Sequence, residues 1–260
     1  MIAPWGTPVQ LIPGGPTLDG QWIDIGLKLV MGWLLVGATG FARAMAIRAC
    51  GDPTPVLTGH LTAAPHRHHS LFSTWLIPAL FLHLFRGTFT WPNGVAIPHD
   101  PRRLSNTGRL LVALSSPLTS ALLGLAALGM IAGLVPGIDL MLGDPAFAAL
   151  QSLSFLGLVG GLLHLFPVPP YEGGEVVRFL LPGAFLKKAW DVVGRLFGLV
   201  LFVSFYLFLM VYFIPSLSWL SAAVRPHLEP ILVPLWRWIV MVITGIASLS
   251  EQVYWLVREG

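Results

Sequence analysis

Charged residues are scarce in this chain. Asp, Glu, Lys and Arg make up 10% of its 260 residues, whereas hydrophobic residues make up 55%. A soluble domain is roughly one quarter charged, and the mean hydropathy here is +0.76. So few polar side chains could not cover the surface of a domain in water. We therefore expect an all-α polytopic membrane protein, because a helix pairs its own backbone groups inside a bilayer.

The sequence has a single cysteine and no cluster of basic residues. The single cysteine, Cys50, excludes an intramolecular disulfide. The first residues have neither a basic region nor a long apolar region, and we expect no cleavable signal peptide. The net charge is only +3 and the basic residues are scattered along the chain, which argues against a nucleic-acid partner.

Five apolar stretches are long enough to cross a bilayer, which takes roughly 20 helical residues. They are residues 23–49, 110–134, 147–166, 192–214 and 231–250. A sixth stretch, residues 71–85, is short and contains Pro78 and His83, and we expect it to be re-entrant or tilted. The predicted organisation is an N-terminal tail (1–22), a membrane core (23–185) and a C-terminal extension of two spans (186–260).

The distribution of Lys and Arg predicts an orientation in the membrane. The tail and the loop 135–146 contain neither residue, whereas the segment between the first two spans is rich in Arg. The loop 167–191 contains Arg178, Lys187 and Lys188. If residues 71–85 do not cross, the basic loops fall on one side, which by the positive-inside rule is cytoplasmic. We therefore expect a bacterial cytoplasmic (inner) membrane protein with its N-terminus outside and its C-terminus inside.

The stretch from His164 to Arg178 is the most informative part of the sequence and reads H-L-F-P-V-P-P-Y-E-G-G-E-V-V-R. Its prolines break a helix, and its paired glycines permit a close approach of the backbone. Glu172 would lie beside or inside the bilayer, where an ionisable group is costly and marks a candidate functional site. The alternative is that Glu172 is solvated at the membrane interface.

This stretch resembles the N-x-x-P-x-P-P-L-D-G-G motif of the site-2-protease family of intramembrane zinc metalloproteases. Glu172 stands where the family has a zinc-binding Asp, and His164 stands where it has Asn. Further segments resemble family motifs in the same order, so that the resemblance covers residues 25–185 and implies a core of about three spans. These segments are G-D-P-T at 51–54 with G-H-L-T at 59–62, F-T-W-P at 89–92 with P-R-R at 101–103, and L-L-V-A-L-S-S-P-L at 110–118.

The catalytic H-E-x-x-H motif of that family is absent. Counted back from G-D-P-T, its first His, its Glu and its second His fall on Thr39, Gly40 and Arg43. Thr39 is a poor zinc ligand, Gly40 cannot accept a proton, and Arg43 would repel a cation. The motif occurs nowhere else in the chain. The resemblance therefore implies an inactive homologue, a pseudoprotease without the inherited hydrolytic activity.

The same resemblance suggests a charge pair. Arg43 and Glu172 occupy two positions that meet at the metal in the family. An Arg–carboxylate pair would neutralise both charges where a cation would otherwise lie. We expect this pair, and the alternative is that Arg43 extends to the inner interface from near the end of its helix.

The other histidines raise two further possibilities. A relocated metal site could use His68 or His69 with His164 and Glu172, or the His-rich segment could be a solvated loop that contacts lipid headgroups or a partner. His83 and His164 lie in apolar stretches and could ligate a haem or hydrogen-bond the backbone within broken helices. We expect neither zinc nor haem, because the spacing is not a known ligand pattern and C-x-x-C-H is absent.

We expect the chain to be a non-catalytic structural or accessory subunit of a larger inner-membrane complex, such as a respiratory or photosynthetic one. Its partners would be other integral membrane subunits and lipids, since the aromatic residues of the last two spans suit membrane interfaces and subunit contacts. One alternative is a regulator that binds the transmembrane helices of client proteins without cleaving them. Another is an active metalloprotease with relocated zinc ligands.

Overall fold

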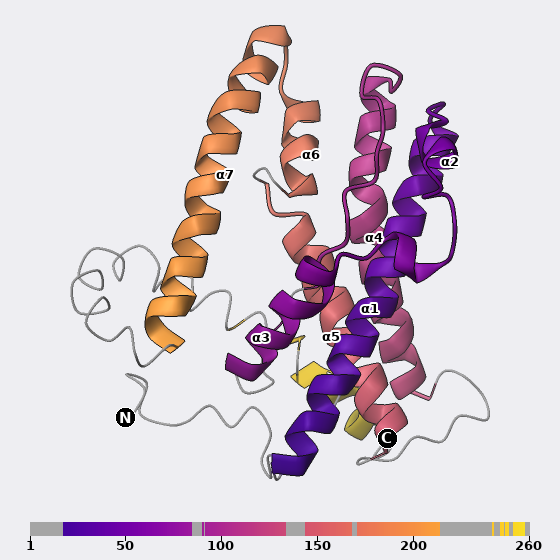
Figure 1. Cartoon of the computed structure of the whole chain (residues 1–260), viewed down its shortest axis with the longest axis vertical. Coiled ribbons are helices and arrows are strands. Elements are labelled where there is room, and N and C mark those ends of the chain that lie inside the picture. The colour runs from indigo at the N-terminus through magenta and orange to yellow at the C-terminus, as the bar shows by residue number, and fades with distance from the viewer. Residues whose placement is uncertain are drawn as a thin grey trace.

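The computed structural model describes residues 18–84, 90, 92–133, 144–167, 171–213, 241, 245, 246, 248, 249 and 252–257. Its regular secondary structure is helical, and these residues contain no strand. Figure 1 shows the helices α1 (Leu18–Ala49), α4 (Asn106–Ile131) and α5 (Pro145–His164) packed side by side in one bundle.

Three of the predicted spans are confirmed as long apolar helices. Ile25–Ala49 of α1, then α4 and α5, have 25, 26 and 20 residues and mean hydropathies of 1.6, 1.8 and 1.8. At about 1.5 Å per residue, roughly 20 residues reach across the hydrocarbon core of a bilayer. Ser105 caps the start of α4 by accepting a hydrogen bond from the Gly108 N–H at 3.0 Å. Each helix is therefore long and apolar enough to cross a membrane.

Glycines let α4 and α5 approach closely. A Cβ atom on Gly157 would lie 2.7 Å from the backbone oxygen of Ser120 and 2.7 Å from the backbone nitrogen of Gly124. A Cβ atom on Gly161 would lie 2.9 Å from the backbone oxygen of Pro117. The Ser120 hydroxyl also donates a hydrogen bond to the Gly157 carbonyl at 2.9 Å. Small residues spaced as G-x-x-x-G are typical of helix contacts inside membranes.

The short apolar stretch forms a π-helical segment, η2 (Leu71–Leu76), followed by α3 (Ile77–Leu84). The chain that returns from it lies alongside. Thr90 Oγ1 donates to the Pro78 carbonyl at 3.1 Å, and the Asn93 N–H donates to the Ser73 carbonyl at 3.1 Å. Residues 90 and 93 therefore lie beside this segment, and its predicted re-entrant course in a membrane stays a prediction.

Asp52 joins the end of α1 to the segment that precedes α4. Its buried carboxylate accepts hydrogen bonds from the Thr54 N–H at 3.0 Å, the Thr54 hydroxyl at 2.5 Å and the Asp100 N–H at 2.6 Å. Burial raises the pKa of Asp52, but these hydrogen bonds lower it by more, so the pKa lies below its ordinary value of 3.8. Thr54 begins the short helix α2 (Thr54–Leu57), and the G-D-P-T sequence thus has a structural role.

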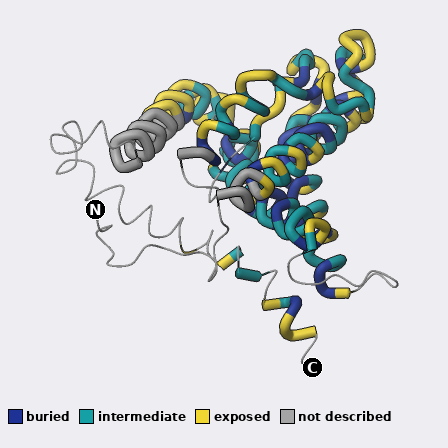
Figure 2. Tube along the Cα trace, turned by 60° about the horizontal axis from the view of Figure 1, so that its bottom comes forward, coloured by how far each residue is buried: buried dark blue, intermediate teal, exposed yellow. Residues whose placement is uncertain are grey.

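Beside the bundle, α6 (Glu172–Leu180) and α7 (Ala184–Phe213) form a helical hairpin (Figure 1). Trp190 Nε1 donates to the Gly174 carbonyl at 3.0 Å, and Arg178 Nε lies 2.8 Å from Asp191 Oδ1. The predicted span 192–214 lies on α7 as far as Phe213. Exposed apolar residues line this helix (Figure 2): Val192, Val193, Leu196, Leu199 and Val200.

The described residues 252–257 contact one end of the bundle. Tyr254 packs edge-on against Phe147, with ring centroids 5.4 Å apart, and shares a buried cluster with Ile131. Ile131 ends α4 and Phe147 lies in the first turn of α5, at the end of the bundle where α1 begins (Figure 1). The predicted orientation, with the N-terminus outside and the C-terminus inside, stays a prediction. The predicted span 231–250 falls mostly outside the described residues.

Candidate functional site

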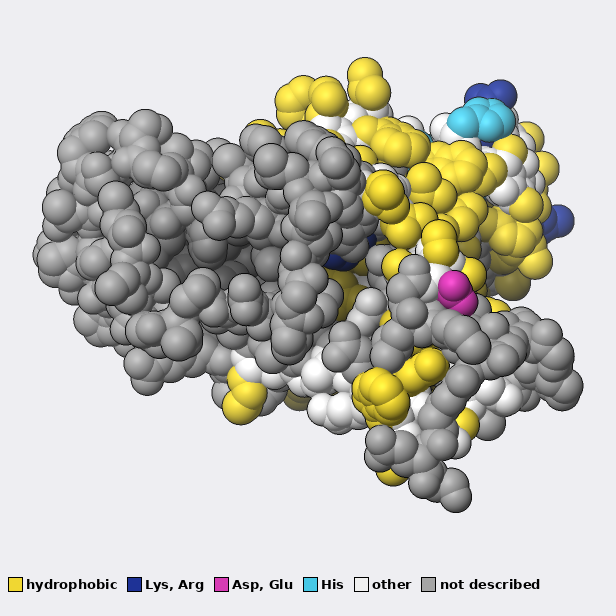
Figure 3. All heavy atoms as spheres, turned by 90° about the horizontal axis from the view of Figure 1, so that it is seen from below, with side chains coloured by type: hydrophobic (Ala, Val, Ile, Leu, Met, Phe, Trp, Pro, Cys, Tyr) yellow, Lys and Arg dark blue, Asp and Glu magenta, His cyan; other side chains and the backbone are white. Residues whose placement is uncertain are grey.

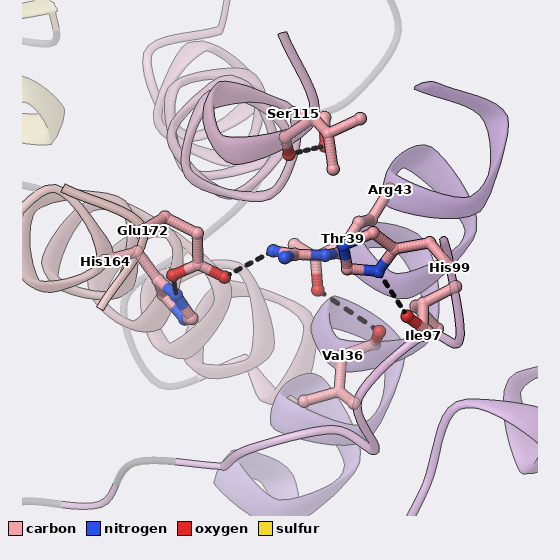
Figure 4. A network of polar contacts seen from close by, with 9 residues as sticks. Val36, Thr39, Arg43, Ile97, His99, Ser115, His164 and Glu172 are labelled. Carbon is pink, nitrogen blue, oxygen red and sulfur yellow. Dashed lines mark hydrogen bonds and ion pairs between the residues drawn. The ribbon is translucent and has the colours of Figure 1, made fainter. Parts of the chain in front are cut away.

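The helical structure is interrupted between α5 and α6, and the candidate site lies at this break in the helix. α5 ends at His164 and α6 begins at Glu172. A Cβ atom on Gly173 would overlap the backbone oxygens of Leu165 and Phe166, so only glycine allows α6 to begin against the end of α5. Figure 4 shows the carboxylate of Glu172 directed toward Arg43 on α1, with the ring of His164 beside Glu172.

Arg43, Glu172 and His164 form one hydrogen-bonded network. Arg43 Nη1 lies 2.7 Å from Glu172 Oε1, and His164 Nδ1 lies 2.7 Å from Glu172 Oε2 (Figure 4). The carboxylate can only accept, so each of its oxygens has its own donor and His164 Nδ1 carries a proton. The three side chains are 23%, 16% and 26% exposed in the order Arg43, Glu172, His164. The pair expected from the sequence thus lies at this break, with His164 as a third member.

The electrostatics of the network favour an ionised Glu172. Burial raises the pKa of Glu172, but the hydrogen bond from His164 and the positive charge of Arg43 lower it by more, so the pKa lies below its ordinary value. The Arg43 side chain is directed toward Glu172 and forms the expected pair. Breaking a buried pair of this kind is costly because it leaves one charge without compensation.

Thr39 and Gly40 take part in the packing of α1. The Thr39 hydroxyl donates to the Leu35 carbonyl at 2.9 Å, within the helix. At Gly40, an added Cβ atom would lie 2.7 Å from both Cγ and Nδ1 of His68. The His68 ring is 1% exposed and its Nε2 lies 2.8 Å from the Thr62 carbonyl oxygen. An imidazole therefore occupies the space beside Gly40, which the sequence resemblance aligns with a general base.

The residues considered for a relocated metal site do not gather at one point. His69 Nε2 lies 2.9 Å from the Trp33 carbonyl oxygen, and His68 is held by Thr62. Over the part of the chain that the structure describes, no three His, Cys, Asp or Glu side chains are grouped as a metal would require. Only His164 and Glu172 of the four candidates come together. The His83 side chain, the partner considered for haem ligation, lies outside the described residues.

Sequence reasoning missed two features of this region. One is the contact of His68 with Gly40, since the short helix η1 (Pro65–Arg67) brings the loop back against the middle of α1. The other is a cavity of about 30 Å³ between α1, α4, α5 and the returning chain after α3, lined in part by Thr39, Ser120 and His164. A glycine inside a predicted helix, Gly40, was the available signal for the contact with His68. No local pattern in the sequence indicated the cavity.

Comparisons with protein-family models, with curated proteins and with solved structures find no match for this chain. The likeness to the site-2-protease family therefore depends on the ordered motifs in residues 25–185. What the structure adds is the arrangement of the side chains at those motifs, in which Arg43, Glu172 and His164 meet.

Proposed function

We propose that this chain is a non-catalytic pseudoprotease with a site-2-protease-like core, and that it acts as a structural or accessory subunit of a larger complex in the bacterial cytoplasmic membrane. The observation that carries the proposal is the network of Arg43, Glu172 and His164 at the positions related to a metal centre. Its N-terminus would lie outside, with residues 71–85 as a re-entrant segment on the cytoplasmic side.

The chemistry of these side chains supports a loss of hydrolysis. Zinc proteases need a cation with an open position, a bound water and a base to take its proton. Here the guanidinium of Arg43 neutralises the carboxylate that would bind the cation, and Gly40 offers no base. An Arg–carboxylate pair keeps the helices together without any metal, which suits a core retained for its shape.

The exposed surface supports a role in assembly. Apolar side chains cover much of the described surface seen from the end where α1 begins (Figure 3). On α7, the apolar residues Val192 and Leu196 are 57% and 61% exposed. Lipid tails or other transmembrane helices would cover such a surface in the membrane. The hairpin of α6 and α7 extends from the bundle and so offers a long contact to a neighbouring subunit.

The test is a purification of the tagged chain from native membranes in mild detergent, with peptide identification and elemental analysis on one sample. The expected result is a fixed stoichiometry with other integral membrane proteins and zinc well below one atom per chain. Near one zinc per chain that disappears in Glu172→Gln would overturn the proposal. Glu175→Gln, an exposed carboxylate one turn further along α6, is the matched control.

The exposed face of α7 also suits a second function, a regulator that binds client transmembrane helices without cleaving them. The same purification separates the two, because a subunit keeps partners in fixed ratio through gel filtration. A regulator would give a mixed and substoichiometric set of membrane proteins that is lost on dilution.

A further inference from the structure

A small cavity lies beside the ionic network, on the side of His164 that faces the bundle. Its volume is about 30 Å³, and its polar lining comes from Thr39 on α1, Thr90 on the returning chain, Ser120 on α4 and His164 on α5. The other lining residues are apolar, among them Leu156 and Val159. Side chains from distant parts of the chain thus bring polar atoms to one partly open cavity.

The three hydroxyls of this lining are hydrogen-bond acceptors toward the cavity. Each hydroxyl has one proton, and each gives it to a backbone carbonyl: Thr39 to Leu35 at 2.9 Å, Thr90 to Pro78 at 3.1 Å and Ser120 to Gly157 at 2.9 Å. Their remaining lone pairs can only accept. An occupant must therefore donate hydrogen bonds or carry positive charge.

The charges nearby decide between these two kinds of occupant. No carboxylate lines the cavity, and the carboxylate oxygens of Glu172 are taken up by Arg43 and His164. A bare cation would meet only neutral oxygens close to a guanidinium, which is unfavourable. Water donates two hydrogen bonds, and a volume of about 30 Å³ is enough for one or two molecules.

We propose that this cavity is an internal hydration site, in which water donates hydrogen bonds to Thr39 and Ser120 beside the ring of His164. Water bound there solvates the half-buried network of Arg43, Glu172 and His164 from the bundle side. This lowers the cost of keeping charges at that depth. The site does not depend on the pseudoprotease proposal, because it would exist in a catalytic or a non-catalytic chain alike.

Radiolytic hydroxyl-radical labelling of the full chain in detergent tests the proposal, since radicals form from water and react where water is bound. Leu156 and Val159 are 4% and 6% exposed, and Leu104 and Val112, which do not line the cavity, are matched controls at 6% and 3%. We expect Leu156 and Val159 to be labelled several-fold faster than their controls. Equal rates would mean a dry cavity and would overturn the proposal.

Substitutions assign the water to the named hydroxyls. The double variant Thr39→Val with Ser120→Ala keeps the shape but removes two acceptors, and we expect the labelling of Leu156 to fall to the rate of Leu104. Thr39→Ser keeps its hydroxyl and should label like the parent chain, which separates hydration from a general loosening of the fold. Unchanged labelling in the double variant would overturn the assignment of the water to these residues.

Discussion

The contact between Gly40 and His68 makes a quantitative prediction for Gly40→Ala. An added Cβ atom would lie 2.7 Å from Cγ and Nδ1 of His68 and 2.9 Å from its Cβ. The ring cannot easily yield, because it is 1% exposed and its Nε2 lies 2.8 Å from the Thr62 carbonyl oxygen. Overpacking of this kind costs about 1–3 kcal/mol, and loss of the histidine hydrogen bond would add about 1 kcal/mol.

Against this, alanine is favoured over glycine in a helix by about 1 kcal/mol. We therefore expect Gly40→Ala to lower the free energy of unfolding by about 1–3 kcal/mol in total. Thermal or denaturant unfolding of the purified chain in detergent measures the difference. The matched control is Gly26→Ala on the same helix, where an added Cβ atom meets nothing within 4 Å. That variant should be neutral or slightly stabilised.

A double-mutant cycle isolates the contact itself. Combined with His68→Ala, the Gly40→Ala substitution should cost much less than it does alone, because the ring that it strikes is gone. The coupling between the two positions should be roughly 1 kcal/mol or more. If Gly40→Ala is as stable as Gly26→Ala, or if the two effects simply add, the packing of His68 against α1 is not as described.

Three further predictions concern the ionic network, the Asp52 turn and the absent H-E-x-x-H motif. Arg43→Gln and Glu172→Gln should each lower the free energy of unfolding by about 1–3 kcal/mol, less than for a fully buried pair, and the double variant should cost less than their sum in a double-mutant cycle. The hydrogen bonds of Asp52 hold its pKa below 3.8 in the folded state. The contribution of Asp52 to stability is therefore present above pH 3.8 and is lost as the pH falls through the folded pKa. Melting temperatures measured from pH 7 downward should decline less steeply in Asp52→Asn than in the parent chain. Restoring the motif with Thr39→His, Gly40→Glu and Arg43→His should not restore zinc binding in elemental analysis, because the added side chain at position 40 collides with the ring beside it.

Each of these predictions has a contrary outcome. Additive effects of Arg43→Gln and Glu172→Gln would mean that the two side chains are not coupled, and the exposed Glu175→Gln gives the baseline for a carboxylate on the same helix. A parallel acid decline in Asp52→Asn would assign the acid sensitivity to other groups. Stoichiometric zinc in the triple variant would show that the site retains room for a metal and its base.

Much of the helical framework is predictable from local sequence. A run of roughly 20 apolar residues has one stable arrangement in a bilayer, a helix that spans it. The bounds of α4 and α5 follow from a capping serine at Ser105 and from Pro145, whose missing N–H does no harm at the start of a helix. That Gly40 has no side chain to act as a base is equally local, because it depends only on which residue is present.

Other features need the positions of residues far apart in the chain. The pairing of Arg43 with Glu172 was predictable only through a family resemblance, since 129 residues separate them. The bond from His164 to the same carboxylate depends on the angle between α5 and α6, which the close approach at Gly173 allows. No local pattern contains that angle.

The sequence by itself determined that the chain is helical and apolar, and three of the five stretches that it marks as long enough to cross a membrane are long apolar helices in the structure. Length and composition decide these properties. It also determined that no H-E-x-x-H is present. Only the tertiary structure decided that His68 fills the space at Gly40, that three hydroxyls line one cavity, and that Tyr254 lies at the end of the bundle where α1 begins. These three features depend on the distances between helices and loops. Such distances result from the packing of whole surfaces against one another, and no single segment of the sequence specifies them.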